Sequence, residues 1–123
     1  MTLELAGLSH VMLGVTDLSR SLRFYETTLG LKVLFRAGDG LVFVDAGQVG
    51  IGLNAGLAAV RHPIAGAVEL VFAVGSVKAA HRALAAEGVI FVTEPRQATE
   101  KEWVATFADP DGHLLTLFGP EGE

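Results

Sequence analysis

The chain contains no cysteine, which excludes disulfide frameworks, thiolate metal sites and cysteine nucleophiles. Positive charge is also scarce, with nine Lys and Arg against fourteen Asp and Glu and a formal net charge of −5. The basic residues are scattered along the chain. Nucleic-acid binding, which needs a basic patch or stripe, is therefore not expected.

Long apolar runs are missing too, since no stretch approaches the about 20 residues of a membrane span. Residues 1–5 carry an acidic residue where a secretory signal has positive charge. We therefore expect a cytoplasmic protein with no membrane partner. The chain has 123 residues, half of them hydrophobic, which fits a single domain over 1–123 with one continuous core.

The first half of the chain predicts a strand, a helix and three further strands. The strand covers 8–15, and Asp17 can cap the helix that follows and that ends at a left-handed Gly30. Turns rich in Gly and Asp then separate three short apolar stretches, at 31–37, 41–44 and 48–54.

The second half repeats this order after a linker over 55–66 that contains Arg61 and His62. A strand over 67–74 leads into a helix capped by Ser76 and closed by Gly88. The later strands are expected at 89–92, 103–108 and 114–118, with a polar loop over 93–99.

The repeat has a consistent register. A shift of about 59 residues aligns His10 with Glu69, and a shift of about 64 aligns Phe43 with Phe107. We place the five-residue difference in the longer polar loop of the second half. A single insertion in a loop is what a duplicated unit tolerates.

Three stretches carry a family resemblance: Leu-Ser-His-Val at 8–11, the capped helix at 17–25 running into Leu-Gly-Leu at 29–31, and Asp-Pro-Asp-Gly-His at 109–113. With them the chain resembles the vicinal oxygen chelate superfamily of glyoxalase I, extradiol dioxygenases, fosfomycin resistance enzymes and bleomycin resistance proteins. The resemblance implies an α+β fold of two paired βαβββ modules that form an incompletely closed barrel around a pocket. Module one would span about 8–54, the linker 55–66 and module two about 67–118. It also implies a homodimer whose pockets combine modules.

Metal-using members of this superfamily place ligands on the first and fourth strands of each module. The resemblance assigns these four positions to His10, Gly52, Glu69 and Thr116. Only His10 and Glu69 are good ligands, whereas a catalytic metal generally has three protein ligands. We therefore expect a pocket without a cofactor, and we keep as the alternative a divalent metal held by His10 and Glu69.

His10 and Glu69 are also the candidate catalytic residues. Glu69 lies in an apolar strand, where a carboxylate should face a wet pocket or pair with a cation, and His10 is the obvious partner. Such a pair could act as a general base. No nucleophile is recognisable beside it, and Met12 stands where fosfomycin enzymes usually carry Thr.

Side-chain alternation predicts an apolar pocket wall in which small residues leave room for a ligand. The glycines favour such a cavity over a filled barrel core. Trp103 could line the pocket mouth or pack at a sheet edge. We expect His81 to be half-buried and structural and His113 to serve the last turn. The candidate substrate-binding residues are Met12, Asn54, Trp103, Thr116 and Phe118.

Three functions stay open at this point. The first is a bleomycin-resistance-like protein that binds a small apolar or aromatic molecule without a metal. The second is a divalent-metal-dependent lyase, isomerase or dioxygenase of the glyoxalase type that uses His10 and Glu69. The third is a mainly structural dimer with a filled core.

Overall fold

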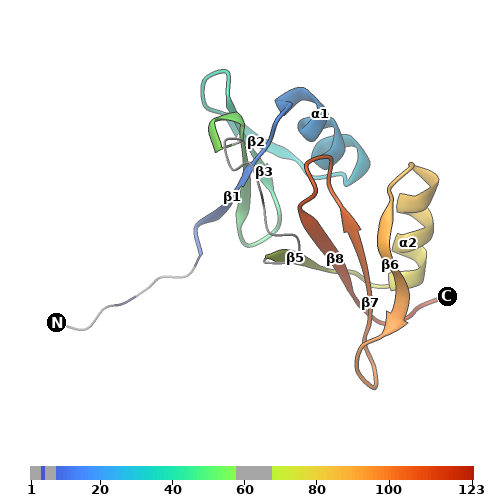
Figure 1. Cartoon of the computed structure of the whole chain (residues 1–123). Helices are drawn as coiled ribbons and strands as arrows, with labels where there is room; N and C mark the ends of the chain where they lie inside the picture. The colour runs from blue at the N-terminus through green and yellow to red at the C-terminus, as the bar shows by residue number, and fades with distance from the viewer. Residues whose placement is uncertain (1–3, 5–7, 58–67) are drawn as a thin grey trace. The chain divides into compact units, whose positions relative to one another are not determined.

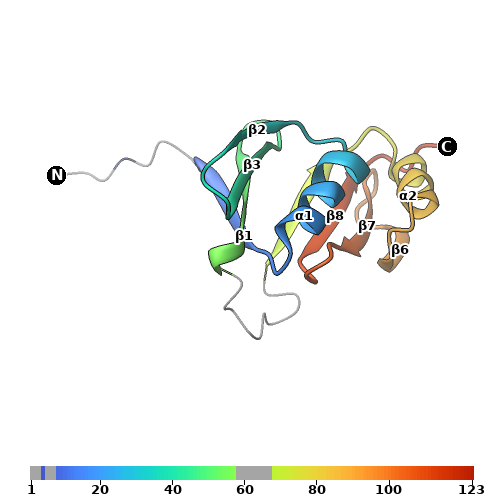
Figure 2. The ribbon, with the colours of Figure 1, turned by 90° about the horizontal axis from the view of Figure 1, so that it is seen from above.

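Each half of the chain forms a four-stranded mixed sheet with a helix on one face (Figures 1 and 2). The computed structural model describes residues 4, 8–57 and 68–123. The chain divides into two compact units, Met1–Arg61 and His62–Glu123, here called unit 1 and unit 2. Most of the predicted linker, with Arg61 and His62, lies outside the described residues. The single domain over 1–123 stays a prediction.

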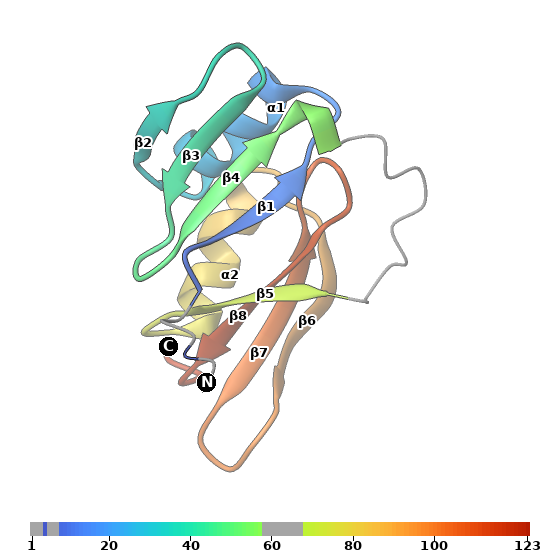
Figure 3. The ribbon, with the colours of Figure 1, turned by 90° about the vertical axis from the view of Figure 1, so that its left-hand side faces the viewer.

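Unit 1 has the predicted order of strand, helix and three strands. The sheet order is β1-β4-β3-β2, with β1 parallel to β4 and the other pairs antiparallel (Figure 3). Its elements are β1 (His10–Gly14), α1 (Leu18–Leu22), the π-helical segment η1 (Arg23–Thr28), β2 (Val33–Arg36), β3 (Leu41–Asp45), β4 (Gly50–Asn54) and the 3-10 turn η2 (Ala55–Leu57).

Unit 2 repeats that arrangement with the sheet order β5-β8-β7-β6, again with only the first pair parallel. Its elements are β5 (Glu69–Ala73), α2 (Val77–Ala86), β6 (Phe91–Gln97), β7 (Trp103–Ala108) and β8 (Leu114–Gly119). The predicted α+β fold of two βαβββ modules is confirmed. Both sheets end in open edges.

The predicted register of the repeat is confirmed for the first and fourth strands. His10 and Glu69 each begin the first strand of their unit, and Gly50 and Leu114 each begin the fourth. The predicted alignment of Phe43 with Phe107 is wrong by one residue, because Phe43 pairs with Gly52 whereas Thr116, the counterpart of Gly52, pairs with Thr106. The polar loop predicted over 93–99 is wrong, because β6 continues to Gln97 and pairs there with Trp103. The extra residues of unit 2 therefore lengthen the β6–β7 hairpin.

Local capping chemistry fixes both helix starts. Asp17 Oδ1 accepts from the Arg20 amide at 3.0 Å, and Ser76 Oγ accepts from the Ala79 amide at 3.0 Å. Gly30 and Gly88 adopt the predicted left-handed conformation after the helices, with φ of 76° and 86°. The first helix differs from the prediction, because its turns widen to π-helix after Leu22.

The buried hydrophobic side chains lie mostly on the face of each sheet that its own helix covers, because alternate residues of a strand point to the same face. In unit 1 they include Leu13, Val15, Val42, Val44, Ile51 and Leu53, and in unit 2 Ala105, Phe107, Leu115 and Leu117. Figure 3 shows α1 and α2 each behind its own sheet. The opposite face of each sheet is here called its helix-free face. No helix in the described part of the chain is long and apolar enough to cross a membrane.

Candidate functional site

His10 lies on the helix-free face of unit 1 at the start of β1. Its Nδ1 is 3.0 Å from Ser9 Oγ, and its ring stands edge-on to Phe43 with centroids 5.3 Å apart. Phe43 in turn stacks on Phe35 with centroids 4.6 Å apart. These three rings come from β1, β3 and β2, and they meet across β4. The sequence did not predict this aromatic row.

A glycine in β4 allows the side chains of β1 and β3 to approach each other across that strand. Gly52 pairs with Met12 on one side and with Phe43 on the other. A Cβ at position 52 would collide with Met12 Sδ and would lie 3.0 Å from Phe43 Cε1. The neighbouring side chains therefore already fill the space that a side chain of residue 52 would need. The glycine at this position therefore leaves no room for a ligand.

Gly50 lies directly opposite His10 in the β1–β4 register. A Cβ there would meet Leu34 Cδ1 at 3.7 Å and His10 Cβ at 3.9 Å, which are ordinary contacts. Leu34 is the extra residue of an irregular pairing between β2 and β3. Gly50 and Gly52, which pair with His10 and Met12, thus have no side-chain atom that could bind a metal. Only position 50 has space for a side chain.

Asn54 ends β4 and uses its side chain locally. Its Oδ1 accepts from the Gly56 amide at 2.8 Å, which fixes the turn into η2. A role of this side chain in substrate binding stays a prediction.

Glu69 lies on the helix-free face of unit 2, where a hydrogen-bonded chain crosses three strands. Glu69 Oε2 accepts from Thr116 Oγ1 at 3.2 Å, and Thr116 Oγ1 lies 2.8 Å from Thr106 Oγ1. Thr93 Oγ1 accepts from the Thr106 amide at 3.0 Å. The side chains of Glu69, Thr116 and Thr106, here called the threonine ladder, run from β5 through β8 to β7.

Apolar side chains flank the threonine ladder on the same face. Val71 is directly opposite Thr116 and is 55% exposed, and Phe118 follows two residues later on β8 and is 37% exposed. Thr116 itself is only 4% exposed. The structure thus brings together Glu69 and two of the predicted substrate-binding residues, Thr116 and Phe118.

Trp103 lies apart from this group. It points to the same face of β7 as Ala105 and Phe107, which are buried on the side that α2 covers. Lys78 of α2 holds its Nζ 5.5 Å from the centre of the Trp103 ring and forms an ion pair with Glu121 at 2.6 Å. Trp103 thus packs on the helix side of an inner strand, and its role in substrate binding stays a prediction.

The two remaining described histidines have structural surroundings, as predicted. His81 is partly buried, with its Nε2 2.7 Å from Glu94 Oε2 and its ring 4.4 Å from that of Phe91. The His113 amide donates to Asp109 Oδ1 at 2.8 Å inside the last turn.

The described donors do not fit a divalent metal. Residues 4, 8–57 and 68–123 contain no group of three or more His, Asp or Glu side chains that could hold one. His10 has a serine and aromatic rings around it, and Glu69 has threonine hydroxyls. Three protein ligands are usual for a catalytic zinc. The pairing of His10 with Glu69 joins the two units and stays a prediction.

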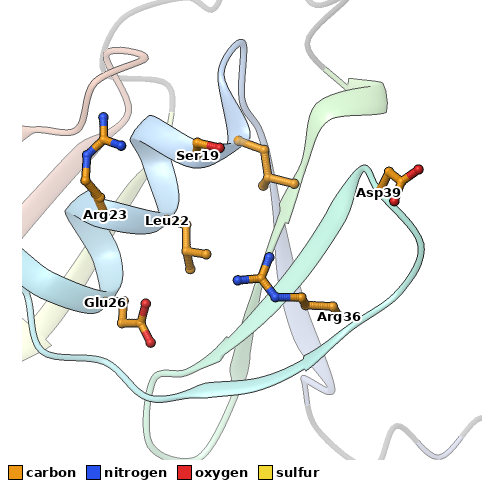
Figure 4. A pocket seen from close by; sticks show the side chains of 7 residues that line it. Ser19, Leu22, Arg23, Glu26, Arg36 and Asp39 are labelled. Atoms are coloured by element: carbon orange, nitrogen blue, oxygen red, sulfur yellow. The ribbon is translucent and has the colours of Figure 1, made fainter.

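A groove of about 280 Å³ on the helix side of unit 1 had no sequence signal. Leu18 and Leu22 form its apolar part, and the charged residues come from η1 and from the β2–β3 hairpin. Figure 4 shows the Arg36 guanidinium pointing toward Leu22 and that of Arg23 pointing away. The complete lining is Leu18, Ser19, Leu22, Arg23, Glu26, Arg36 and Asp39.

Comparisons with known proteins give one family. Residues 7–117 match the model of the Glyoxalase/Bleomycin resistance protein/Dioxygenase superfamily. An uncharacterized protein of Mycolicibacterium smegmatis is 30% identical over 110 residues, which cover 89% of this chain and 90% of that protein.

Two solved structures show the range of proteins with this fold. TnmS3, an antibiotic binding protein from Streptomyces sp. CB03234, is 25% identical with a TM-score of 0.75, over 95% of this chain and 99% of its own. Lactoylglutathione lyase from Agrobacterium tumefaciens is 15% identical with a TM-score of 0.73, over 92% of each chain. The second likeness shows the fold alone.

Proposed function

Since this chain belongs to the Glyoxalase/Bleomycin resistance protein/Dioxygenase superfamily, we propose that it binds a small apolar or aromatic molecule without a metal. The observation that carries this proposal is the filled space above Gly52. A metal-ligating side chain there would have to displace the Met12 thioether. Thioether and aromatic groups instead make a surface suited to flat apolar molecules.

The helix-free face of unit 1 supplies the apolar surface. Phe35 is 54% exposed and is held by its stacking on Phe43, so its ring is available in a fixed orientation. A rigid exposed aromatic ring gives contact area at a small cost in conformational entropy. The likeness to an antibiotic binding protein supports the same reading.

A screen of aromatic compounds by thermal shift, in a buffer with a chelator, tests the proposal. A ligand that binds only the folded protein raises the free energy of unfolding, by about 2.7 kcal/mol at a ligand concentration about one hundred times Kd. The melting temperature rises with it. This readout does not depend on Trp103, which packs on the helix side.

Phe35→Ala and Ile90→Ala make a matched pair for any compound found. Both side chains are exposed, but only Phe35 stacks on the helix-free face of unit 1. We expect Phe35→Ala to weaken binding by about 1 kcal/mol and Ile90→Ala to leave it unchanged. If no compound shifts the melting temperature, the proposal fails.

A metal-dependent lyase, isomerase or dioxygenase is the second candidate, with His10 and Glu69 as its ligands or catalytic pair. It is favoured by the equivalent places of the two residues, each exposed at the start of the first strand of its unit. Repeating the screen with zinc, nickel or manganese in place of the chelator separates the two. Binding that requires the metal and is lost in His10→Ala would favour the enzyme.

A homodimer is the assembly that we propose, because apolar side chains are exposed on both sheets. Leu34 and Phe35 in unit 1 and Val71 in unit 2 are each more than half exposed. Analytical ultracentrifugation of the purified chain tests this, with a mass of twice 12.9 kDa expected. The cytoplasmic location stays a prediction.

A further inference from the structure

The threonine ladder of unit 2 orders its hydroxyl protons in one direction. A carboxylate only accepts hydrogen bonds, so Thr116 donates its single hydroxyl proton to Glu69. The Thr116 oxygen is then the acceptor for the hydroxyl of Thr106, 2.8 Å away. Every hydroxyl of the ladder therefore points toward the carboxylate.

This order orients the Glu69 side chain and strengthens the hydrogen bond that Thr116 donates to it. Hydrogen bonds in a row polarise one another, and those to an ionised group are the stronger ones. Thr116 is 4% exposed, so solvent cannot easily replace its bond to Glu69. The ladder thus presents an oriented carboxylate at the edge strand β5.

Glu69 has no ion-pair partner within the described ranges, where the ion pairs are Lys78–Glu121 and His81–Glu94. Its own side chain is exposed. On the same face Val71 follows two residues later on β5, and Phe118 lies further along β8, opposite Ala73. An oriented carboxylate next to exposed apolar side chains is the complement of a molecule with a positive group on an apolar body.

We propose that the helix-free face of unit 2 binds a small molecule through a protonated amine or amidine that pairs with Glu69, next to an aromatic or apolar part that packs on Val71 and Phe118. This inference rests on the proposed function and narrows the class of ligand. Thr116 is a positioning residue, since it acts through the Glu69 carboxylate. No such ladder accompanies His10, whose described neighbours are Ser9 and Phe43.

Three probes of one shape but different charge test the proposal: 1-naphthylmethylamine, 1-naphthylmethanol and 1-naphthoate. Their affinities are measured from amide proton–nitrogen spectra of the full chain near pH 7. We expect the amine to bind about fivefold more tightly than the alcohol, as a partly exposed charge pair would give, and the carboxylate to bind most weakly.

Variants then separate Glu69 from general surface charge. In Glu69→Gln we expect the amine and the alcohol to bind equally. Glu94→Gln removes an exposed carboxylate that pairs with His81, and should keep the wild-type preference. Thr116→Val should lower the preference, whereas Thr116→Ser keeps the hydroxyl and should retain it.

The outcomes distinguish this inference from the function on which it rests. Equal binding of amine and alcohol by the wild-type chain overturns the cation preference but leaves small-molecule binding intact. A preference that survives in Glu69→Gln also overturns it. If none of the three probes binds, at concentrations where the wild-type chain stays folded, the proposed function fails together with this inference.

Discussion

On the helix-free face of unit 1, His10 meets an aromatic row and Met12 covers a glycine, whereas on that of unit 2 Glu69 ends a row of threonine hydroxyls. The two faces are built on strands of the same order and register. The helix-covered sides are alike, both being packed with aliphatic and aromatic residues. Duplication thus preserved the core while the helix-free faces acquired different chemistry.

The helix-covered faces of the two units support the fold, whereas we assign ligand recognition to the helix-free faces. Residues at matching positions, such as Gly52 and Thr116 or Met12 and Val71, differ in polarity and size. Substitutions on these faces should therefore have effects that depend on the unit. The predictions below follow from that difference.

The largest effect is expected for Gly52→Ala in unit 1. Its Cβ would collide with Met12 Sδ, which can swing aside, but it would also lie 3.0 Å from Cε1 of Phe43, whose ring is held by His10 and Phe35. Overpacking of this kind costs about 1–3 kcal/mol of unfolding free energy. Urea unfolding measures it. Gly50→Ala is the control, since its nearest contact would be 3.6 Å, and it should leave the stability unchanged or raise it. Equal losses in both variants would contradict the filled space above Gly52.

Thr116→Val should lower the free energy of unfolding by about 1–2 kcal/mol. The substitution keeps the shape of the side chain but removes the bonds to Glu69 and Thr106, and it deprives the half-buried Thr106 hydroxyl of this partner. The double variant Thr116→Val, Thr106→Val should lose less unfolding free energy than the sum of the two single variants. In the double variant no Thr106 hydroxyl remains without its hydrogen-bond partner. Strict additivity in this double-mutant cycle would show that the two hydroxyls are not coupled.

The smallest effect is expected on the helix side of unit 2. Glu94→Gln removes the charge from the contact with His81 at 2.7 Å, but the Glu94 side chain is 77% exposed. Exposed ion pairs contribute roughly 0.2–1 kcal/mol, and we expect a loss in the lower half of that range from urea unfolding. A loss as large as that of Thr116→Val would mean that the ladder is no more important to stability than a surface pair.

Local chemistry made most of the fold predictable from the sequence. The caps at Asp17 and Ser76, the glycines after both helices and the alternation along β1 each depend on residues close together in the chain. The π-helical turn at Arg23–Thr28 was missed, since apolar spacing does not distinguish it from an α-helix. The strand continuing to Gln97 was missed because its sequence is polar and contains Pro95.

The site was predictable only in its parts. His10, Glu69 and Thr116 could be named from their positions in the repeat, but the bond from Thr116 to Glu69 and the link to Thr106 join strands distant in sequence. Likewise, Met12 was predicted to line the pocket, while its packing over Gly52 depends on the β1–β4 register. Contacts of this kind follow from strand pairing, which the sequence alone does not specify residue by residue.

Element analysis tests the central claim, that this protein binds its ligand without a metal, most directly. The chain is loaded with zinc, nickel, manganese or iron(II), passed through gel filtration and assayed for bound metal, together with His10→Ala and Glu69→Gln. We expect far less than one metal ion per chain, with no difference among the three proteins, because the described residues offer no set of three ligands. Nearly one metal ion per wild-type chain that disappears in both variants would contradict the account.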